Sequence, residues 1–130
     1  MARIRIIDDD PEVRDLIAEI LAAAGYSVST YDRIEGAIRL LENDPPDLIL
    51  LDVMFPENAS GGLELAMEIR RNERIRTLPI ILLTNINQEF PIGLSTKDID
   101  PQWMPVQEFL EKPVSRGELL RKVGELLIKS

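Results

Sequence analysis

A regular alternation of apolar runs with helix-like segments between residues 3 and 84 is the feature that most restricts the fold. The run Leu-Ile-Leu-Leu at 48–51 is apolar at every position, which is typical of a strand buried on both faces of a sheet. Strands that alternate with helices predict a parallel sheet with helices on both of its faces. Five strands are predicted, at residues 3–7, 27–31, 47–52, 80–84 and 108–110.

Capping residues and apolar spacing locate the first two helices. The first is predicted to begin at Pro11, with Asp10 as its N-cap, and to end at Gly25. Its apolar residues recur every three or four positions, which indicates one buried stripe. The second helix is expected to take Asp32 as its N-cap and to end before the prolines at 45–46.

Two further helices follow from the same signals. One is predicted over residues 63–72, and the preceding Gly61 and Gly62 are interpreted only as loop residues. The last helix is predicted after Ser115, because Ser115 and Glu118 have the spacing of a capping box.

The composition leaves few kinds of chemistry open. The 130 residues contain no cysteine and no histidine, which excludes disulfides, thiolate and imidazole metal ligands, and catalysis by either residue. The net charge of −8 argues against direct binding of nucleic acid, which needs a concentrated basic surface. No apolar run approaches the length that spans a bilayer, and no signal peptide is evident. We therefore expect one cytoplasmic domain over residues 1–130, with no membrane partner.

Polar residues follow four of the predicted strands. Asp8 and Asp9 follow the first, Asp52 the third, Thr84 the fourth and Lys112 the fifth. Parallel sheets place ligands beyond these strand ends. Clustered carboxylates repel one another, and Mg²⁺ removes that conflict because it prefers oxygen ligands. An ammonium and a hydroxyl nearby suit phosphoryl oxygens. The sequence therefore predicts a site for a phosphoryl group on or beside a carboxylate.

Four separated motifs resemble those of the receiver domain of two-component response regulators. This family includes the chemotaxis regulators. The motifs are Ile-Ile-Asp-Asp-Asp at 6–10, Leu-Leu-Asp-Val-Met-Phe-Pro at 50–56, Ile-Leu-Leu-Thr at 81–84 and Phe-Leu-Glu-Lys-Pro at 109–113. The resemblance covers essentially the whole chain. It implies a flavodoxin-like, doubly wound α/β fold with five parallel strands in the order 2-1-3-4-5. It also implies a phosphorelay protein that switches partner binding and is not an enzyme.

In that family the aspartate that ends the third strand accepts a phosphoryl group from a sensor histidine kinase or a phosphotransfer protein. The resemblance therefore implies that Asp52 is the phosphoacceptor. It implies that Asp8 and Asp9 bind Mg²⁺ together with Asp52, and that the backbone carbonyl of Met54 is a further ligand. Neither the kinase nor the output partner follows from the sequence.

The resemblance assigns the remaining site residues as well. Thr84 and Lys112 are the implied hydroxyl and ammonium that assist phosphorylation. Thr84 and Phe109 are the implied switch pair, which moves when the acyl phosphate forms. The peptide bond between Lys112 and Pro113 is implied to be cis, a state that needs proline.

Residues 85–107 depart from the family pattern. A receiver normally places its fourth helix there, but this stretch holds prolines at 91, 101 and 105. Proline inside a helix costs about 3 kcal/mol, so we expect a short or displaced fourth helix at most.

Three other functions fit the sequence less well than a phosphoacceptor does. A Mg²⁺-dependent phosphohydrolase of the haloacid-dehalogenase type needs a second acid two residues after its nucleophile, and that position is Met54. A flavin-binding module on the same fold would place its phosphate beside three aspartates at 8–10. A pseudo-receiver that binds partners without phosphorylation is a third alternative, less favoured because Asp52, Thr84 and Lys112 are intact.

Overall fold

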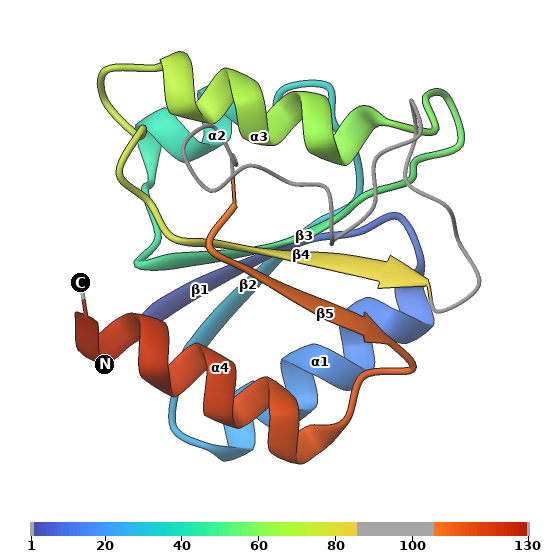
Figure 1. Cartoon of the computed structure of the whole chain (residues 1–130), viewed down its shortest axis with the longest axis vertical. Coiled ribbons are helices and arrows are strands. Elements are labelled where there is room, and N and C mark those ends of the chain that lie inside the picture. The colour runs from blue at the N-terminus through green and yellow to red at the C-terminus, as the bar shows by residue number, and fades with distance from the viewer. Residues whose placement is uncertain (1, 86–105, 130) are drawn as a thin grey trace.

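Five parallel strands form a single sheet in the order β2-β1-β3-β4-β5. Figure 1 shows this computed structural model, which describes residues 2–85 and 106–129. The order confirms the predicted flavodoxin-like topology, in which the chain reverses direction across the sheet after β2. The strands are β1 Arg3–Ile7, β2 Ser27–Tyr31, β3 Leu48–Asp52, β4 Ile80–Asn85 and β5 Glu108–Lys112.

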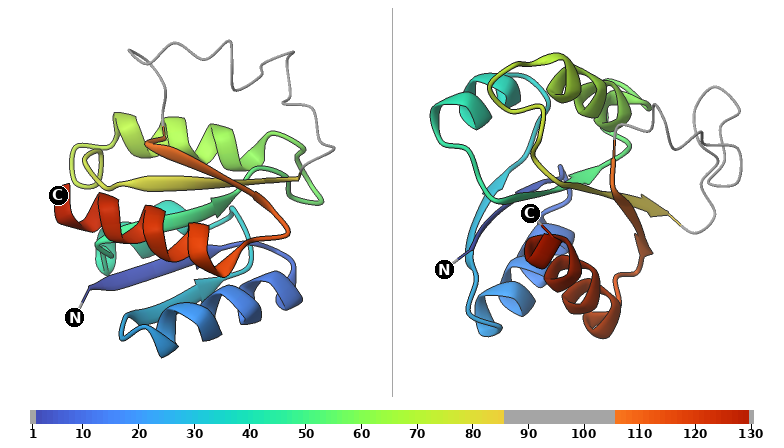
Figure 2. Two further views of the ribbon diagram at one scale, coloured as in Figure 1. Left: turned by 60° about the horizontal axis from the view of Figure 1, so that its bottom comes forward. Right: turned by 60° about the vertical axis from the view of Figure 1, so that its left-hand side comes forward.

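Helices cover both faces of the sheet, as the alternating sequence predicted (Figures 1 and 2). On one face lie α2 (Ala37–Asn43) and α3 (Gly61–Arg71), and on the other lie α1 (Pro11–Ala23) and α4 (Arg116–Lys129). The expected short or displaced helix within 85–107 falls almost wholly outside the described residues. None of the helices in the described part of the chain is long and apolar enough to cross a membrane.

The central strand β3 is buried along its whole length and contributes to two apolar layers. Ile49 and Leu51 pack in the layer under α2 and α3, whereas Leu48 and Leu50 pack under α1 and α4. Burying one such side chain contributes roughly 1.5–3 kcal/mol. The strand that ends in Asp52 is therefore anchored in both apolar layers.

Helix α1 begins as its sequence predicted. The Asp10 carboxylate accepts a hydrogen bond of 2.9 Å from the backbone N–H of Glu12, and Pro11 occupies the first helical position. Gly25 follows the helix with a positive φ of 98°, a conformation that favours glycine. The cap places the start of α1 directly after the acidic end of β1.

The predicted N-cap of α2 is wrong. The helix begins only after Gly36, whose φ is 81°, and the Asp32 carboxylate pairs with Arg33 at 2.8 Å instead of capping the helix. The hydroxyl of Tyr31 donates to the Glu35 carbonyl at 2.5 Å and closes a turn before the helix. The positive φ of Gly36 is a conformation that L side chains rarely adopt, so this turn favours glycine.

The segment from β5 to α4 agrees with the prediction. The N–H of Glu118 donates to Ser115 Oγ at 3.3 Å, and α4 begins beside this cap. The bond between Lys112 and Pro113 is cis, as the resemblance implied. The strand β5 runs two residues further than predicted, which makes Lys112 its last residue.

Candidate functional site

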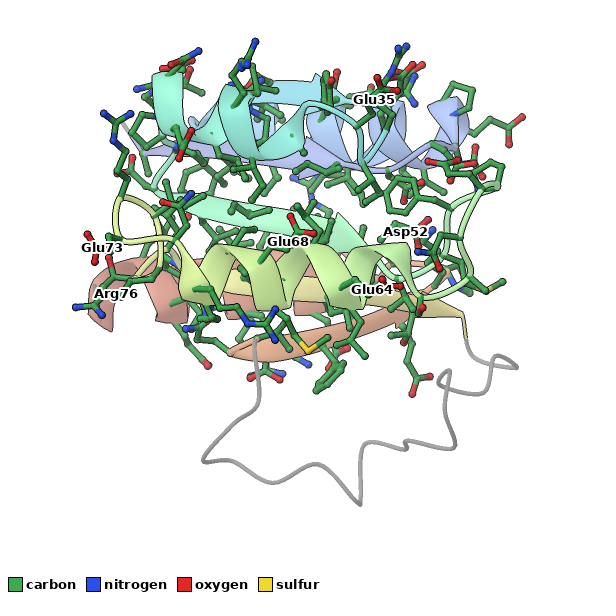
Figure 3. The ribbon with its side chains drawn as sticks, turned by 90° about the horizontal axis from the view of Figure 1, so that it is seen from above. Glu35, Asp52, Glu64, Glu68, Glu73 and Arg76 are labelled. Atoms are coloured by element: carbon green, nitrogen blue, oxygen red, sulfur yellow. The ribbon has the colours of Figure 1, made fainter. Side chains whose placement is uncertain are left out.

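The sheet register brings the predicted site residues to one edge. Ile7 of β1 pairs with Leu51 of β3, so Asp8 and Asp52 lie side by side one step further along. Lys112 ends β5 at the same edge of the sheet. The strand arrows point to this edge in Figure 1, and Figure 3 shows Asp52 at the tip of β3, where α3 begins.

Three carboxylates gather at this edge. Asp8, Asp9 and Asp52 each offer an oxygen, and these oxygens lie within 4.8 Å of one another. The side chain of Asp8 is 0% exposed, Asp52 is 5% exposed, and Asp9 is half-buried. Buried carboxylates at this separation repel one another, and each loses part of its hydration. A nearby positive charge would therefore stabilise this cluster of carboxylates.

Lys112 supplies one such charge. Its Nζ lies 2.9 Å from Asp8 Oδ2 and donates a hydrogen bond of 3.2 Å to Asp52 Oδ1. Burial alone would lower the pKa of Lys112, but the close contact with Asp8 and the charges of both carboxylates outweigh it and raise that pKa. The ammonium stays protonated, yet one ammonium does not balance three carboxylates.

The excess of negative charge in this cluster affects the pKa of Asp52. Burial, followed by the charge of Asp8, raises the pKa of the Asp52 carboxyl to about 7, although Lys112 opposes the shift. Near neutral pH, without a further cation, a large fraction of Asp52 is therefore protonated. A cation bound beside it would favour the ionised form.

The carboxylate of Asp8 shows where such a cation fits. Its Oδ1 accepts a hydrogen bond of 2.9 Å from the N–H of Asp10, but its buried Oδ2 accepts none from the described residues and only faces Lys112. Met54 lies two residues after Asp52, and its carbonyl accepts no hydrogen bond from the described part of the chain. Carboxylate and carbonyl oxygens in a negatively charged cluster are the ligands that Mg²⁺ prefers, so these residues fit that ion.

Thr84 and Phe109 lie on the opposite side of the sheet from the carboxylates. In strands, alternate side chains share a face. Leu82 and Phe109 pack in the layer under α2 and α3, and Thr84, two residues after Leu82, is buried on that face. Leu110 packs under α1 and α4, so Lys112 belongs to the other face, with Asp52. The structure thus groups Asp52 with Lys112, and Thr84 with Phe109.

Gly62 is a site residue that the sequence analysis missed, because it was interpreted only as part of a loop. Gly61 and Gly62 are the first residues of α3. The N–H of Gly62 donates to the carbonyl of Val53 at 2.8 Å. A β-carbon on Gly62 would lie 1.7 Å from the backbone oxygen of Asp52. The glycine therefore lets α3 start directly against the strand end that carries Asp52.

Comparisons with known proteins agree with this architecture. The response regulator receiver domain family matches residues 4–124. The chain is 36% identical over 128 residues to the DNA-binding dual master transcriptional regulator RpaA of Synechocystis, covering 98% of this chain and 49% of RpaA. It is 32% identical over 124 residues to the phosphate regulon regulatory protein PhoB of Pseudomonas aeruginosa, covering 95% of this chain and 51% of PhoB. The chain therefore spans about half the length of these curated relatives.

Solved structures show the same likeness. The receiver domain of a signal transduction histidine kinase from Syntrophus aciditrophicus superposes with a TM-score of 0.79 at 29% sequence identity, covering 99% of this chain and 92% of that one. The family match extends over nearly the whole chain. The chain belongs to the receiver domains of two-component response regulators.

Proposed function

We propose that residues 1–130 act as one receiver domain in which Asp52 accepts a phosphoryl group from a phosphohistidine of a histidine kinase or phosphotransfer protein. The observation that carries this proposal is the position of the Asp52 carboxylate. It ends a fully buried strand, lies 3.2 Å from the Lys112 ammonium, and shares an acidic cluster with Asp8 and Asp9. This arrangement suits a carboxylate that attacks phosphorus.

The proposal includes Mg²⁺ as the cofactor. The carboxylates of Asp8, Asp9 and Asp52 and the backbone carbonyl of Met54 would hold it. When bound, the ion would neutralise carboxylate charge and the charge that develops on the phosphoryl oxygens. The buried Oδ2 of Asp8, which faces Lys112 but accepts no hydrogen bond from the described residues, and the raised pKa of Asp52 both support a cation at this position.

In the proposed transfer the ionised Asp52 attacks the phosphorus of the phosphohistidine. A P–O bond forms to the aspartate while the P–N bond breaks, and its electron pair stays on the imidazole nitrogen. Lys112 already binds Oδ1 of Asp52, which leaves Oδ2 as the attacking oxygen. The same ammonium is placed to bind an oxygen of the transferred group.

The output would run through Thr84 and Phe109. We assign the Thr84 hydroxyl as the donor to the new phosphoryl group, because Thr84 directly follows Leu83, the β4 residue that pairs with Asp52 of β3. Phe109 shares a sheet face with Thr84, so a shift of Thr84 toward the phosphate opens space on the Phe109 side. A changed position of Phe109 would alter the surface that an output partner contacts.

A groove beside the site suits the phosphoryl donor. It has a volume of about 170 Å³ and is lined in part by Val13, Leu16 and Ile17 of α1 and by Val114. Leu16 is 50% exposed, so part of its apolar surface in the groove is available to a docked partner. Lys112 also lines this groove, so an apolar helix docked there would lie beside the acidic cluster.

The test is the intact mass of the chain after incubation with acetyl phosphate. The wild-type chain should gain the mass of one phosphoryl group when Mg²⁺ is present and none when the ion is chelated. The variant Asp52→Asn should gain none, whereas Asp15→Asn, a change at an exposed aspartate of α1, should behave as wild type. A wild-type chain that gains no mass would favour a pseudo-receiver, and an Asp52→Asn chain that still gains it would contradict the assignment of Asp52.

A further inference from the structure

We infer that Arg14 is a positioning residue for the acidic cluster, acting through the peptide bond that joins Asp8 to Asp9. This inference rests on the proposed Mg²⁺ site. Arg14 lies in the first turn of α1 and is half-buried. Its Nη1 donates a hydrogen bond of 2.8 Å to the backbone carbonyl of Asp8.

Asp8 is held at each of its other polar groups. Its N–H donates to the Tyr31 carbonyl at 3.0 Å, which extends the sheet ladder by one residue. Its Oδ1 accepts from the N–H of Asp10, and its Oδ2 faces Lys112 at 2.9 Å. The carbonyl bound by Arg14 is the remaining polar group. Without Arg14 the strand and the side chain of Asp8 would stay fixed, but the outgoing peptide would lose its restraint.

That peptide determines where Asp9 points. A peptide unit is planar, so fixing its carbonyl oxygen also fixes the direction of its N–H and of the next α-carbon. The next α-carbon is that of Asp9, the half-buried and most accessible acid of the cluster. Holding the Asp8 carbonyl therefore holds the Asp9 carboxylate in the cluster.

The group that accepts the hydrogen bond from Arg14 determines which oxygens remain available to bind the metal. Arg14 binds a neutral carbonyl, and no described contact joins its guanidinium to the carboxylates of Asp8, Asp9 or Asp52. Its hydrogen bond therefore leaves their oxygens to the metal. Groups that orient ligands in this indirect way commonly change metal affinity when they are removed.

Removing Arg14 has two effects on Mg²⁺ affinity, and they act in opposite directions, so a measurement of that affinity tests the inference. Arg14 is a cation near a cation site, so the loss of its charge alone should strengthen Mg²⁺ binding. The loss of the hydrogen bond to the Asp8 carbonyl should release Asp9 and weaken Mg²⁺ binding. Measuring the Mg²⁺ affinity of Arg14→Met by isothermal titration calorimetry distinguishes the two.

We expect Arg14→Met to bind Mg²⁺ about tenfold more weakly than the wild-type chain. Arg14→Lys retains a charge and a donor and should recover part of the affinity, which also covers the case in which Arg14→Met folds poorly. The control is Arg33→Met. It removes a cation of the neighbouring β2–α2 turn that pairs with Asp32, and it should leave Mg²⁺ affinity unchanged or slightly stronger.

The urea midpoint of each metal-free variant separates a positioning role from a general loss of stability. A general loss would shift this midpoint without a selective loss of Mg²⁺ affinity. Equal or tighter Mg²⁺ binding by folded Arg14→Met would overturn the inference and leave the proposed phosphorylation of Asp52 intact. A wild-type chain that binds no Mg²⁺ would overturn the inference together with the proposed metal site.

Discussion

The α-carbon of Gly62 packs against the backbone carbonyl of Asp52 so closely that a β-carbon would lie 1.7 Å from the oxygen. The contacted atom is backbone of a fully buried strand, so it cannot move aside as a flexible side chain can. The first turn of α3 is thus seated on the strand end that carries the proposed phosphoacceptor. Any side chain at position 62 must push the helix and the strand apart.

Replacing Gly62 with alanine should therefore be costly. We expect Gly62→Ala to lower the free energy of unfolding by about 2–3 kcal/mol or more, because overpacking against fixed backbone strains the structure. Urea unfolding followed by circular dichroism measures this change.

Gly124→Ala in α4 is the matched control, since no atom lies within 4 Å of a β-carbon built there. Removing a glycine from a helix interior should raise stability by about 0.5–1 kcal/mol. Equal effects of the two substitutions would show that the close approach at Gly62 is not important.

The raised pKa of Asp52 predicts how stability depends on pH. Because burial and Asp8 raise that pKa to about 7, the folded chain binds this proton more tightly than the unfolded chain does. The contribution of Asp52 to stability is therefore fully present below the ordinary aspartate pKa and is lost as pH rises through about 4 to about 7.

The comparison of wild type with Asp52→Asn isolates this contribution. Without divalent ions, Asp52→Asn should gain at least about 1 kcal/mol over wild type when the pH is raised from about 5 to about 8. Urea unfolding at the two pH values, with a chelator present, gives the difference. Parallel stability changes in both chains would mean that Asp52 is not titrating in this range.

Mg²⁺ binding should depend on Asp9 far more than on its neighbour Asp10. Asp9→Asn removes one carboxylate of the cluster, so Mg²⁺ affinity measured by calorimetry should fall about tenfold or more. Asp10 is exposed and caps α1 through its bond to Glu12, a role that asparagine fulfils equally well. Asp10→Asn should therefore bind Mg²⁺ nearly as wild type does. Similar losses in both variants would point to net charge as the cause.

We expect Leu16 to affect the rate of phosphoryl transfer from a protein donor but not from a small-molecule donor. Leu16→Gln keeps the helix propensity of α1 but removes an apolar contact from the groove beside Lys112. Transfer from a phosphorylated histidine kinase should slow several-fold, while phosphorylation by acetyl phosphate stays unchanged. Glu19→Gln, an exposed change on α1 outside the groove, is the control. If Leu16→Gln slows both donors equally, the defect lies in the site itself.

The placement of Asp8, Asp52 and Lys112 was predictable because parallel strands end at one edge of a sheet. Strand residues are read from local apolar patterns, and the register then brings their ends together without further information. The shared face of Thr84 and Phe109 also follows from alternation along neighbouring strands, once the register is known.

Features that depend on close helix–strand packing or on individual side-chain hydrogen bonds were not predictable. The role of Gly62 depends on how closely α3 approaches β3, which no local pattern records. The start of α2 was misplaced because the Tyr31 hydroxyl closes a turn that a capping rule at Asp32 does not anticipate. The hydrogen bond from Arg14 to the Asp8 carbonyl is likewise visible only in three dimensions.

The central claim, that Asp52 is the phosphoacceptor, is tested most directly by locating the modification in the chain. After incubation with acetyl phosphate and Mg²⁺, borohydride reduces an aspartyl phosphate to homoserine, which marks the residue for peptide mass spectrometry. The account predicts that homoserine appears at position 52 alone, and nowhere in the Asp52→Asn chain. Homoserine at Asp8 or Asp9, or an unmodified Asp52 in a chain that has gained a phosphoryl group, would contradict it.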